Sequence, residues 1–287
     1  PTRRAMQAGA MTTIETGTTD LLARVDDGVG VVTFNRPDRR NALSDAMYHG
    51  FKQALPAMAM DPAVRVVMVT GADGAFCAGG DVKGMHAQHT TSEARAGQPP
   101  SRDDRVAYLR LRQRWVSEAL HNMPKPVVAA LPGAAAGAGL SIALAADLRI
   151  AAERAILVTA FANVGASGDF GGSWFLTHLL GPAKAKEHYF TSPRLTATEA
   201  AELGLVNQVF PDEGFGEAAM GYCRNLAERT PIAMRYMKEN INRAAHADLL
   251  AALDAEAANM VHTMSTTDHR EAAAAFVEKR PPQFSGE

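Results

Sequence analysis

Two stretches of small residues dominate this sequence, and each follows a run of apolar residues. The first is GAFCAGGDV (74–82), which comes directly after RVVMVTG (65–71). The second is GAAAGAGLS (133–141), which comes after PVVAALP (126–132). Short apolar runs that end in glycine are typical of buried strands that leave a sheet through a tight turn. Each turn leads into another apolar pattern, so each is expected to carry the chain into the start of a helix.

Two helix N-termini that converge can bind one negatively charged oxygen from both sides. Backbone N–H groups at the start of a helix have no intrahelical acceptor, and glycine or alanine lets a ligand approach them closely. The two turns therefore suggest an oxyanion hole made of main-chain donors, without any side chain. A purely structural interpretation, in which the glycines only supply positive φ to tight turns, stays open on these residues alone.

Short strands alternate with helices up to about residue 160, which predicts an α/β core. Strands are expected at 21–25, 30–35, 65–71, 126–133 and 148–152. Ser44 is placed to cap a helix that runs to residue 60, and Pro56 should shorten or kink that helix. A mobile loop is expected over 87–104, because this segment is polar and contains a Gly-Gln-Pro-Pro cluster. Residues 104–123 then carry apolar residues at helical spacing.

The last third of the chain has a different character. Thr196 and Glu199 form a capping box for a short helix that ends at Gly204. Helices rich in alanine and methionine are expected at 214–229, 232–244, 247–263 and 267–278. Their apolar stripes must pack on the core or on another copy of the chain. The expected organisation is a flexible leader (1–18), an α/β core (19–205) and a helical C-terminal region (206–287).

Charge and cysteine content limit the partners and the compartment. The formal net charge of the 287 residues is −2 and no long basic run is present, so no nucleic-acid partner is expected. The two cysteines cannot form a disulfide framework, and we find neither a secretory signal nor a membrane span. These features favour a cytoplasmic protein without a membrane partner. The nine histidines show no metal-binding spacing, so no metal is expected.

Four segments in this order resemble the enoyl-CoA hydratase/isomerase (crotonase) superfamily. They are NRPDRRNALS (35–44), GAFCAGGDVKGM (74–85), PKPVVAALPGAAAGAGLSIALAADLRIA (124–151) and LTATEAAELGLVNQVFP (195–211). The resemblance implies a spiral of ββα units and a helical C-terminal region that forms homotrimers, which can pair into hexamers. It also implies an acyl-CoA thioester substrate, so that coenzyme A is part of the substrate and no separate cofactor is needed.

The shared mechanism of that superfamily is stabilisation of a thioester enolate by two peptide N–H groups. By resemblance, the two donors fall on Gly80 and Ala138. Many members have glycine where this chain has Ala138, and alanine fits there if its φ is negative. Substrate contacts implied by the resemblance fall on Arg39, Arg40, Ala42, Ala78, Asp81, Val82 and Gly137. The two arginines suit the phosphates of CoA, although a solvated surface turn would explain them equally well.

The sequence departs from the hydratases of this superfamily at both of their glutamates. Ser141 and Phe161 stand at these positions, so the groups that activate water and protonate carbon are missing. Asp169, before Gly-Gly and an apolar segment, matches a place where isomerase members carry a proton-shuttling aspartate. Its structural alternative is an N-cap of the following helix. Ser141 could contact substrate or be a small helix residue, and Phe161 could line the acyl pocket or belong to the core.

These residues favour an enzyme that moves the double bond of an enoyl-CoA with Asp169 as the base. Hydration, other enolate chemistry and a non-catalytic acyl-CoA-binding protein are the alternatives. A dinucleotide site is disfavoured because GAGLSI lacks the third glycine of that motif. Other side chains rank lower as functional groups: Cys77, His121, His188 and the loop acids Glu93, Asp103 and Asp104.

Overall fold

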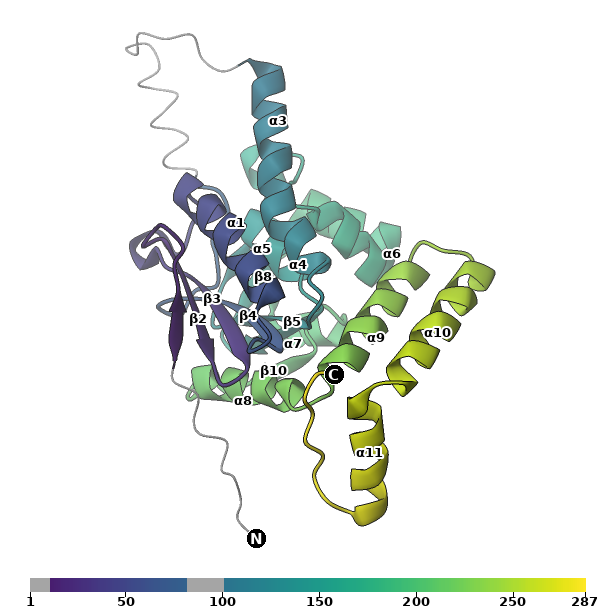
Figure 1. The fold of residues 1–287 in the computed structure, drawn as a ribbon. Helices are drawn as coiled ribbons and strands as arrows, with labels where there is room; N and C mark the ends of the chain where they lie inside the picture. The colour runs from purple at the N-terminus through teal and green to yellow at the C-terminus, as the bar shows by residue number, and fades with distance from the viewer. Residues whose placement is uncertain (1–10, 82–100) are drawn as a thin grey trace.

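A seven-stranded sheet forms the centre of the computed structural model, which describes residues 11–81 and 101–287 (Figure 1). The strands lie in the order β1 (Thr12–Ile14), β2 (Leu21–Asp26), β3 (Val29–Phe34), β4 (Val66–Gly71), β5 (Val127–Leu131), β7 (Leu148–Ala152) and β10 (Gln208–Phe210). The first three pair antiparallel, and β3 to β10 pair parallel. A second, three-stranded sheet contains β6 (Ala135–Ala136), β8 (Ile156–Val158) and β9 (Leu195–Thr196).

Strands β4 and β5 are buried on both faces, as their continuous apolar sequences predict. On β4, Val67 and Val69 face the core cluster that contains α1 (Asp45–Met60). Val66 and Met68 point to the opposite face, which α8 (Phe215–Ala227) covers. The sheet therefore lies between two helical layers. Because β4 and β5 are parallel neighbours, the two small-residue turns that follow them leave the same edge of the sheet.

Three helical segments run from the edge of the core to the start of β5. They are α3 (Arg102–Gln113), a π-helical turn (Arg114–Glu118) and α4 (Ala119–His121). Ser101 and Asp104 form a capping box at the start of α3. The prediction that Asp103 and Asp104 belong to a loop is therefore wrong, because both lie in the first turn of this helix. Glu93 and the rest of the expected loop up to residue 100 lie outside the described residues.

Pro56 neither shortens nor kinks its helix, contrary to the sequence-based expectation. Ser44 accepts a hydrogen bond from the Met47 N–H at the N-terminus, and α1 continues through Pro56 to Met60. Pro56 is exposed to solvent. Water can therefore hydrogen-bond the carbonyl that loses its N–H partner at this position, which lowers the cost of the proline.

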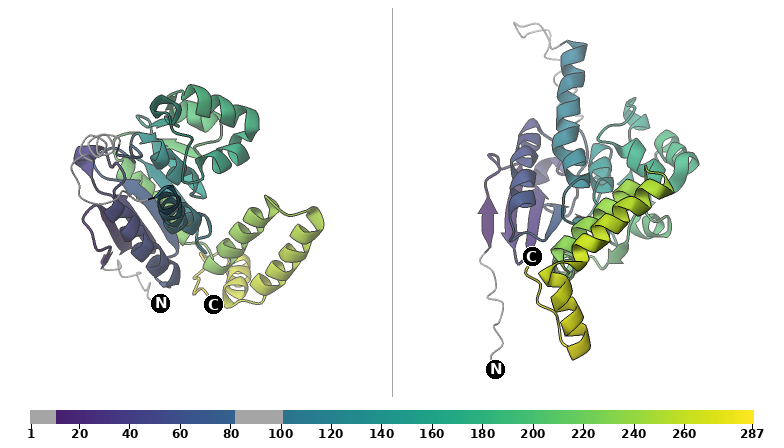
Figure 2. Two further views of the ribbon diagram at one scale, coloured as in Figure 1. Left: turned by 90° about the horizontal axis from the view of Figure 1, so that it is seen from above. Right: turned by 45° about the vertical axis from the view of Figure 1, so that its right-hand side comes forward.

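The C-terminal helices project from the body of the molecule. After α6 (Gly172–Thr191) and α7 (Ala197–Glu202), the chain forms α9 (Pro231–Ala244), α10 (Leu249–Met264) and α11 (Thr267–Glu278). Helices α9 and α10 lie side by side and extend away from the sheet (Figure 2). Apolar side chains are exposed along α10 and α11, where Leu250 is 74% and Phe276 is 85% exposed.

Two of the expected boundaries need correction. Residues 12–14 are not part of a flexible leader, because β1 pairs with β2 in the sheet. The helical C-terminal region does not begin at residue 206, because β10 pairs with β7 and α8 covers the sheet. The projecting region consists of α9 to α11. Both errors have the same cause, since a three-residue strand gives too short a pattern to be recognised in sequence.

Candidate active site

The two small-residue turns pair directly with each other. Cys77 forms a parallel bridge with Ala135, and the Ala136 N–H donates to the Cys77 carbonyl over 2.9 Å. Gly79 has a φ of +85°, and a Cβ on it would lie 2.6 Å from the Ala136 carbonyl oxygen and 3.2 Å from the Ala138 nitrogen. Only glycine fits this approach, because no real side chain tolerates such contacts. Gly80 is the residue after Gly79, so its amide is held close to the Ala138 amide.

The N–H groups of Gly80 and Ala138 are both available to a ligand. Ala138 is the first residue of α5 (Ala138–Leu144), where N–H groups have no intrahelical acceptor. Within residues 11–81 and 101–287, neither N–H donates to a backbone carbonyl. The positive φ of this turn falls on Gly137, at +53°, and Ala138 is not among the described residues with positive φ. Alanine is therefore accommodated at 138, as expected.

Asp169 lies in the turn before α6, with a partly unsatisfied carboxylate. Its Oδ1 is buried and has no hydrogen-bond partner in the part of the chain that the structure describes. Burial raises the pKa of Asp169 to about 6. The alternative role of N-cap is wrong, because Gly171 occupies the cap position of α6. A buried carboxylate without a partner is costly for a fold and is typical of sites that act on a ligand.

The raised pKa of Asp169 predicts the pH dependence of any reaction that needs its carboxylate as a base. We expect kcat/KM to rise about tenfold per pH unit up to about pH 6 and to level off above it. Steady-state rates in buffers of constant ionic strength would show this limb. A limb centred near the ordinary aspartate pKa of 3.8 would contradict a buried base.

The same shift gives a stability check that needs no substrate. The pKa is about 6 in the folded protein and 3.8 in the reference state, so the folded chain holds the proton more tightly between these values. The free energy of unfolding should therefore fall as pH rises through this window. We expect Asp169→Asn to raise the melting temperature at neutral pH and to lose this advantage near pH 4.

Comparison with known proteins identifies the family of the chain. Residues 24–287 match the family described as Enoyl-CoA hydratase/isomerase. The chain belongs to the enoyl-CoA hydratase/isomerase family. It is 34% identical over 266 residues to 1,2-epoxyphenylacetyl-CoA isomerase of Escherichia coli (strain K12), covering 93% of this chain and 98% of the relative. It is 37% identical to the human mitochondrial enoyl-CoA hydratase domain-containing protein 2, covering 92% and 88% of the two chains.

Solved structures of the enoyl-CoA hydratase/isomerase family share the fold. The crystal structure of an enoyl-CoA hydratase from Polaromonas sp. JS666 superimposes with a TM-score of 0.84, at 33% identity over 92% of this chain and 99% of that one. The enoyl-CoA hydratase from Bacillus anthracis gives 0.84 at 31% identity, over 93% and 100%. The expected crotonase fold, with its helical C-terminal region, is therefore confirmed.

The two positions where hydratases of the enoyl-CoA hydratase/isomerase family carry glutamates hold no acid here. Ser141 is buried on α5, and its Oγ donates to the Gly137 carbonyl over 3.3 Å. Phe161 is buried and stacks on Tyr189, with 5.8 Å between ring centroids. Tyr189 comes from α6 and was not recognised in the sequence, because no motif surrounds it. Its hydroxyl interacts with Ser141, and burial raises its pKa to about 12, so it is protonated at neutral pH.

Gly172 leaves room for this pair of hydroxyls. A Cβ on Gly172 would lie 2.2 Å from the Ser141 Oγ and 2.7 Å from the Tyr189 hydroxyl. We expect Gly172→Ala to displace the turn that carries Asp169 and to lower turnover by about tenfold or more. Combining it with Tyr189→Phe and Ser141→Ala should restore part of the loss. Unchanged rates and melting temperature in the single variant would show that this contact relaxes freely.

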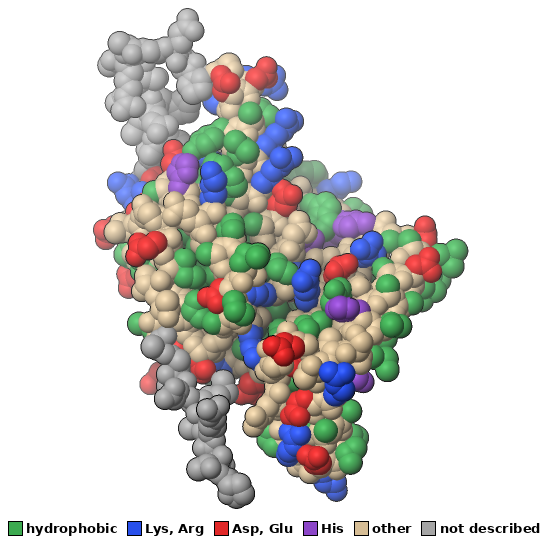
Figure 3. All heavy atoms as spheres, viewed as in Figure 1, with side chains coloured by type: hydrophobic (Ala, Val, Ile, Leu, Met, Phe, Trp, Pro, Cys, Tyr) green, Lys and Arg blue, Asp and Glu red, His purple; other side chains and the backbone are tan. Residues whose placement is uncertain are grey.

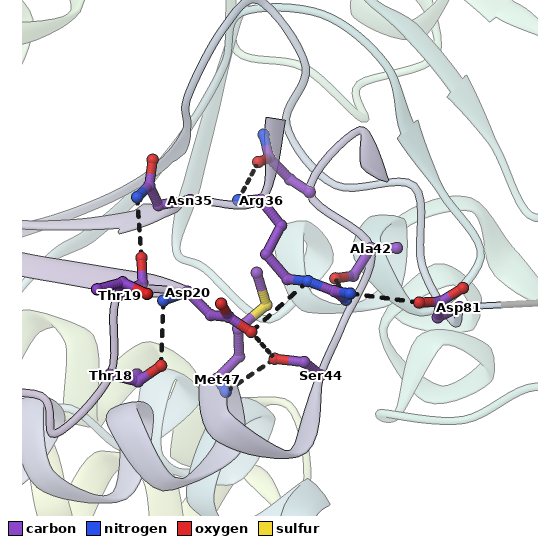
Figure 4. Close-up of polar contacts among 10 residues, drawn as sticks. Thr18, Thr19, Asp20, Asn35, Arg36, Ala42, Ser44, Met47 and Asp81 are labelled. Atoms are coloured by element: carbon purple, nitrogen blue, oxygen red, sulfur yellow. Dashed lines mark hydrogen bonds and ion pairs between the residues drawn. The ribbon is translucent and has the colours of Figure 1, made fainter. Parts of the chain in front are cut away.

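The residues expected at the CoA side of the site fall into two groups. Arg39 and Arg40 are exposed and form no ion pair with the described residues. Ala42 and Asp81 are both contacted by Arg36, whose side chain is only 21% exposed (Figure 4). The Ala78 N–H donates to the Arg40 carbonyl over 3.0 Å, which ties the arginine loop to the Gly80 turn. Val82 lies outside the described residues.

The remaining candidates have structural explanations. Cys77 is buried, and burial raises its pKa to about 12, so its thiol is not activated. Burial, together with Lys238, lowers the pKa of His121, and burial lowers that of His188. Among the residues that the structure describes, no three metal-binding side chains cluster, and no helix has the length and apolarity to cross a bilayer.

A cavity of about 850 Å³ lies between α3, the start of α6 and α9. Phe170 and Gly171, next to Asp169, form part of its wall, but Gly80 and Ala138 do not line it. Its other walls carry more cations than anions, among them Arg110 and Arg235. The Phe170 ring of the cavity wall stacks on Tyr48, with 5.7 Å between the ring centroids.

Proposed function

We propose that the protein isomerises an acyl-CoA thioester through an enolate, with Asp169 as the single base. Gly80 and Ala138 would bind the thioester oxygen through their N–H groups. The observation that carries this proposal is that Asp169 has a buried Oδ1 without a hydrogen-bond partner among the described residues and a raised pKa, while Ser141 and Phe161 replace the usual glutamates.

Moving a double bond requires only one proton-transfer group. With a 3-enoyl-CoA, the Asp169 carboxylate takes a proton from C2, and the electron pair moves through the dienolate onto the thioester oxygen. The protonated Asp169 then returns this proton at C4, which leaves the double bond between C2 and C3. Each N–H donor that strengthens as the oxygen gains charge is worth about 3 kcal/mol in such sites. We propose that this chemistry needs no metal and no cofactor besides the CoA of the substrate.

The names of relatives suggest two further substrates or reactions. The E. coli relative is named 1,2-epoxyphenylacetyl-CoA isomerase, which indicates another reaction without a change in mass. Other relatives are named hydratases, among them the mouse methylglutaconyl-CoA hydratase, 32% identical. Hydration is the second candidate. It is less well supported because Ser141 is neutral and Phe161 apolar, so neither can activate water.

Chromatographic retention and product mass together distinguish these reactions. The protein is incubated with 3-hexenoyl-CoA, 2-hexenoyl-CoA and an epoxidised phenylacetyl-CoA, after dialysis against EDTA, and products are separated by reversed-phase chromatography and analysed by mass spectrometry. Isomerisation gives a product of unchanged mass and different retention time, which is lost in Asp169→Asn. A gain of one water would instead show hydration. Thioester binding without turnover of any substrate would show a non-catalytic homologue.

The exposed apolar faces of α9 to α11 support self-association, and we propose a homotrimer or a dimer of trimers. Figure 3 shows apolar side chains along the outer edge of α10. On α10, Leu249, Leu250 and Val261 are each more than 70% exposed. Contiguous apolar surface of this kind is typical of an interface.

Size-exclusion chromatography with light scattering should therefore give three or six times the mass of the chain. We expect Leu250→Asp to shift the protein toward the monomer, because it places a charge in the apolar contact. Met60→Asp is the matched control, since Met60 is 83% exposed on α1, away from these helices. A monomeric wild-type protein would contradict the proposal.

A further inference from the structure

We propose that Arg36 positions and polarises the Gly80 N–H, and thus sets the strength of the oxyanion hole. The inference rests on the proposed role of Gly80. Arg36 lies at the end of β3 and does not reach the site itself. Its effect is transmitted through two peptide groups that join its guanidinium to the Gly80 amide.

The hydrogen bonds form a continuous line. Arg36 Nη1 donates to the Ala42 carbonyl over 2.8 Å. The N–H of the same peptide group, that of Leu43, donates to the Gly79 carbonyl over 2.8 Å. The Gly79 carbonyl belongs to the same peptide group as the Gly80 N–H. Because each trans peptide is planar, with its C=O and N–H pointing in opposite directions, the Leu43 hydrogen bond fixes where the Gly80 N–H points.

The positive charge at the far end of this line also strengthens its last donor. Hydrogen bonds arranged head to tail polarise one another, and a charged donor is stronger than a neutral one. Arg36 thus draws electron density along the line, away from the Gly80 N–H. The Gly80 N–H becomes a better donor to an oxygen that gains negative charge.

Further contacts hold the guanidinium in this position. Its Nη2 lies 3.4 Å from the Asp81 Oδ2, and its Nε lies 3.6 Å from the Asp20 Oδ2 (Figure 4). Asp20 in turn accepts a hydrogen bond of 2.6 Å from Ser44, the N-cap of α1. Asp81 directly follows Gly80, so the same guanidinium holds the donor turn from both sides. The three contacts come from three different nitrogens of the planar guanidinium, and the single nitrogen of a lysine cannot span the same three acceptors.

The surroundings of Arg36 separate its role from that of the neighbouring arginines. It is flanked by two carboxylates and is mostly covered, so it is not placed to bind the phosphates of CoA. Arg39 and Arg40 are exposed and are not ion-paired with any described residue. Arg36 should therefore affect binding of the thioester carbonyl, whereas Arg39 and Arg40 should affect binding of the CoA phosphates.

The test compares two ligands that differ only in the thioester carbonyl. Butyryl-CoA carries the carbonyl, and its thioether analogue, butyl-CoA, does not. Isothermal titration gives the dissociation constants of both for wild type, Arg36→Lys, Arg36→Met and the control Arg39→Met/Arg40→Met. Wild type should bind the thioester about tenfold more tightly, as expected for the hydrogen bonds to one carbonyl.

We expect Arg36→Lys and Arg36→Met to reduce this preference to about threefold or less, with thioether binding almost unchanged. The control should weaken both ligands equally and retain the preference, because phosphate contacts do not involve the carbonyl. If Arg36→Met fails to fold, Arg36→Lys alone carries the test.

A wild-type preference that both Arg36 variants retain would overturn the role of Arg36. A wild type that binds the two ligands equally would instead show that the carbonyl is not held, which contradicts the proposed function itself. Loss of fold alone would change the fraction of protein that binds, not the ratio of the two affinities.

Discussion

Asp169→Asn is expected to lower kcat about 1,000-fold or more on the 3-enoyl-CoA of the proposed reaction. Asparagine has almost the same shape and cannot accept a proton, so the change removes the base and keeps the packing. General acid–base groups contribute about 10²–10⁴-fold to rates, and Asp81, the acid that follows Gly80, is already ion-paired with Arg36. The measurement is steady-state turnover, with the affinity for an unreactive acyl-CoA determined in parallel.

Asp103→Asn is the matched control, because this exposed acid lies in the first turn of α3. It should leave both turnover and affinity unchanged. The affinity of Asp169→Asn for an acyl-CoA should also stay within about threefold, since the base does not hold the ground state. A loss of less than about tenfold in kcat would show that another group takes the proton, and Glu93 would then be the first residue to test.

Ala138→Pro is expected to lower kcat by about 10²–10³-fold by removing a single N–H. Ala138 is the first residue of α5, where proline is well tolerated because its missing N–H has no intrahelical partner. The preceding Gly137, with φ +53° and ψ −125°, can adopt backbone conformations that other residues before proline cannot. Turnover and the melting temperature should be measured together.

Ala138→Gly keeps the N–H and serves as the control, with turnover expected within about threefold of wild type. The ratio of thioester to thioether affinity should fall in Ala138→Pro and not in Ala138→Gly. Full turnover in a folded Ala138→Pro protein would exclude this amide as an oxyanion donor. Loss of the helix, seen by circular dichroism, would mean that the variant has disturbed more than one bond.

The residues that could be recognised in the sequence are those whose role depends on local pattern. Apolar runs such as 65–71 predicted buried strands, and the glycines after them predicted tight turns that lead into helices. The structure brings the Gly80 and Ala138 turns together, and Gly79 shows why the contact requires glycine. The assignment of the two donors to Gly80 and Ala138 came from the resemblance to the crotonase superfamily, because no local pattern shows which residue of each turn donates.

The residues that were missed act through tertiary contacts. Tyr189 lies inside α6 and meets Ser141 only because α5 and α6 pack together. Arg36 reaches Asp81 across 45 positions of sequence, and nothing in the sequence around either residue indicates the pair. The same holds for β10, whose three residues form a strand only because β7 offers an unpaired edge. Patterns of neighbouring residues cannot predict such contacts.

The placement of the two donors on the main chain has a consequence for how such a protein can change. In the proposed function, every residue other than proline at positions 80 and 138 would contribute the same N–H to the thioester, provided that the neighbouring Gly79 keeps the two turns in contact. In the proposed function, the side chains at 141, 161 and 169 would instead determine which proton transfers form the enolate and consume it. In the proposed function, main-chain groups would bind the thioester oxygen and side chains would select the reaction, so this fold offers a starting point for designing new thioester conversions.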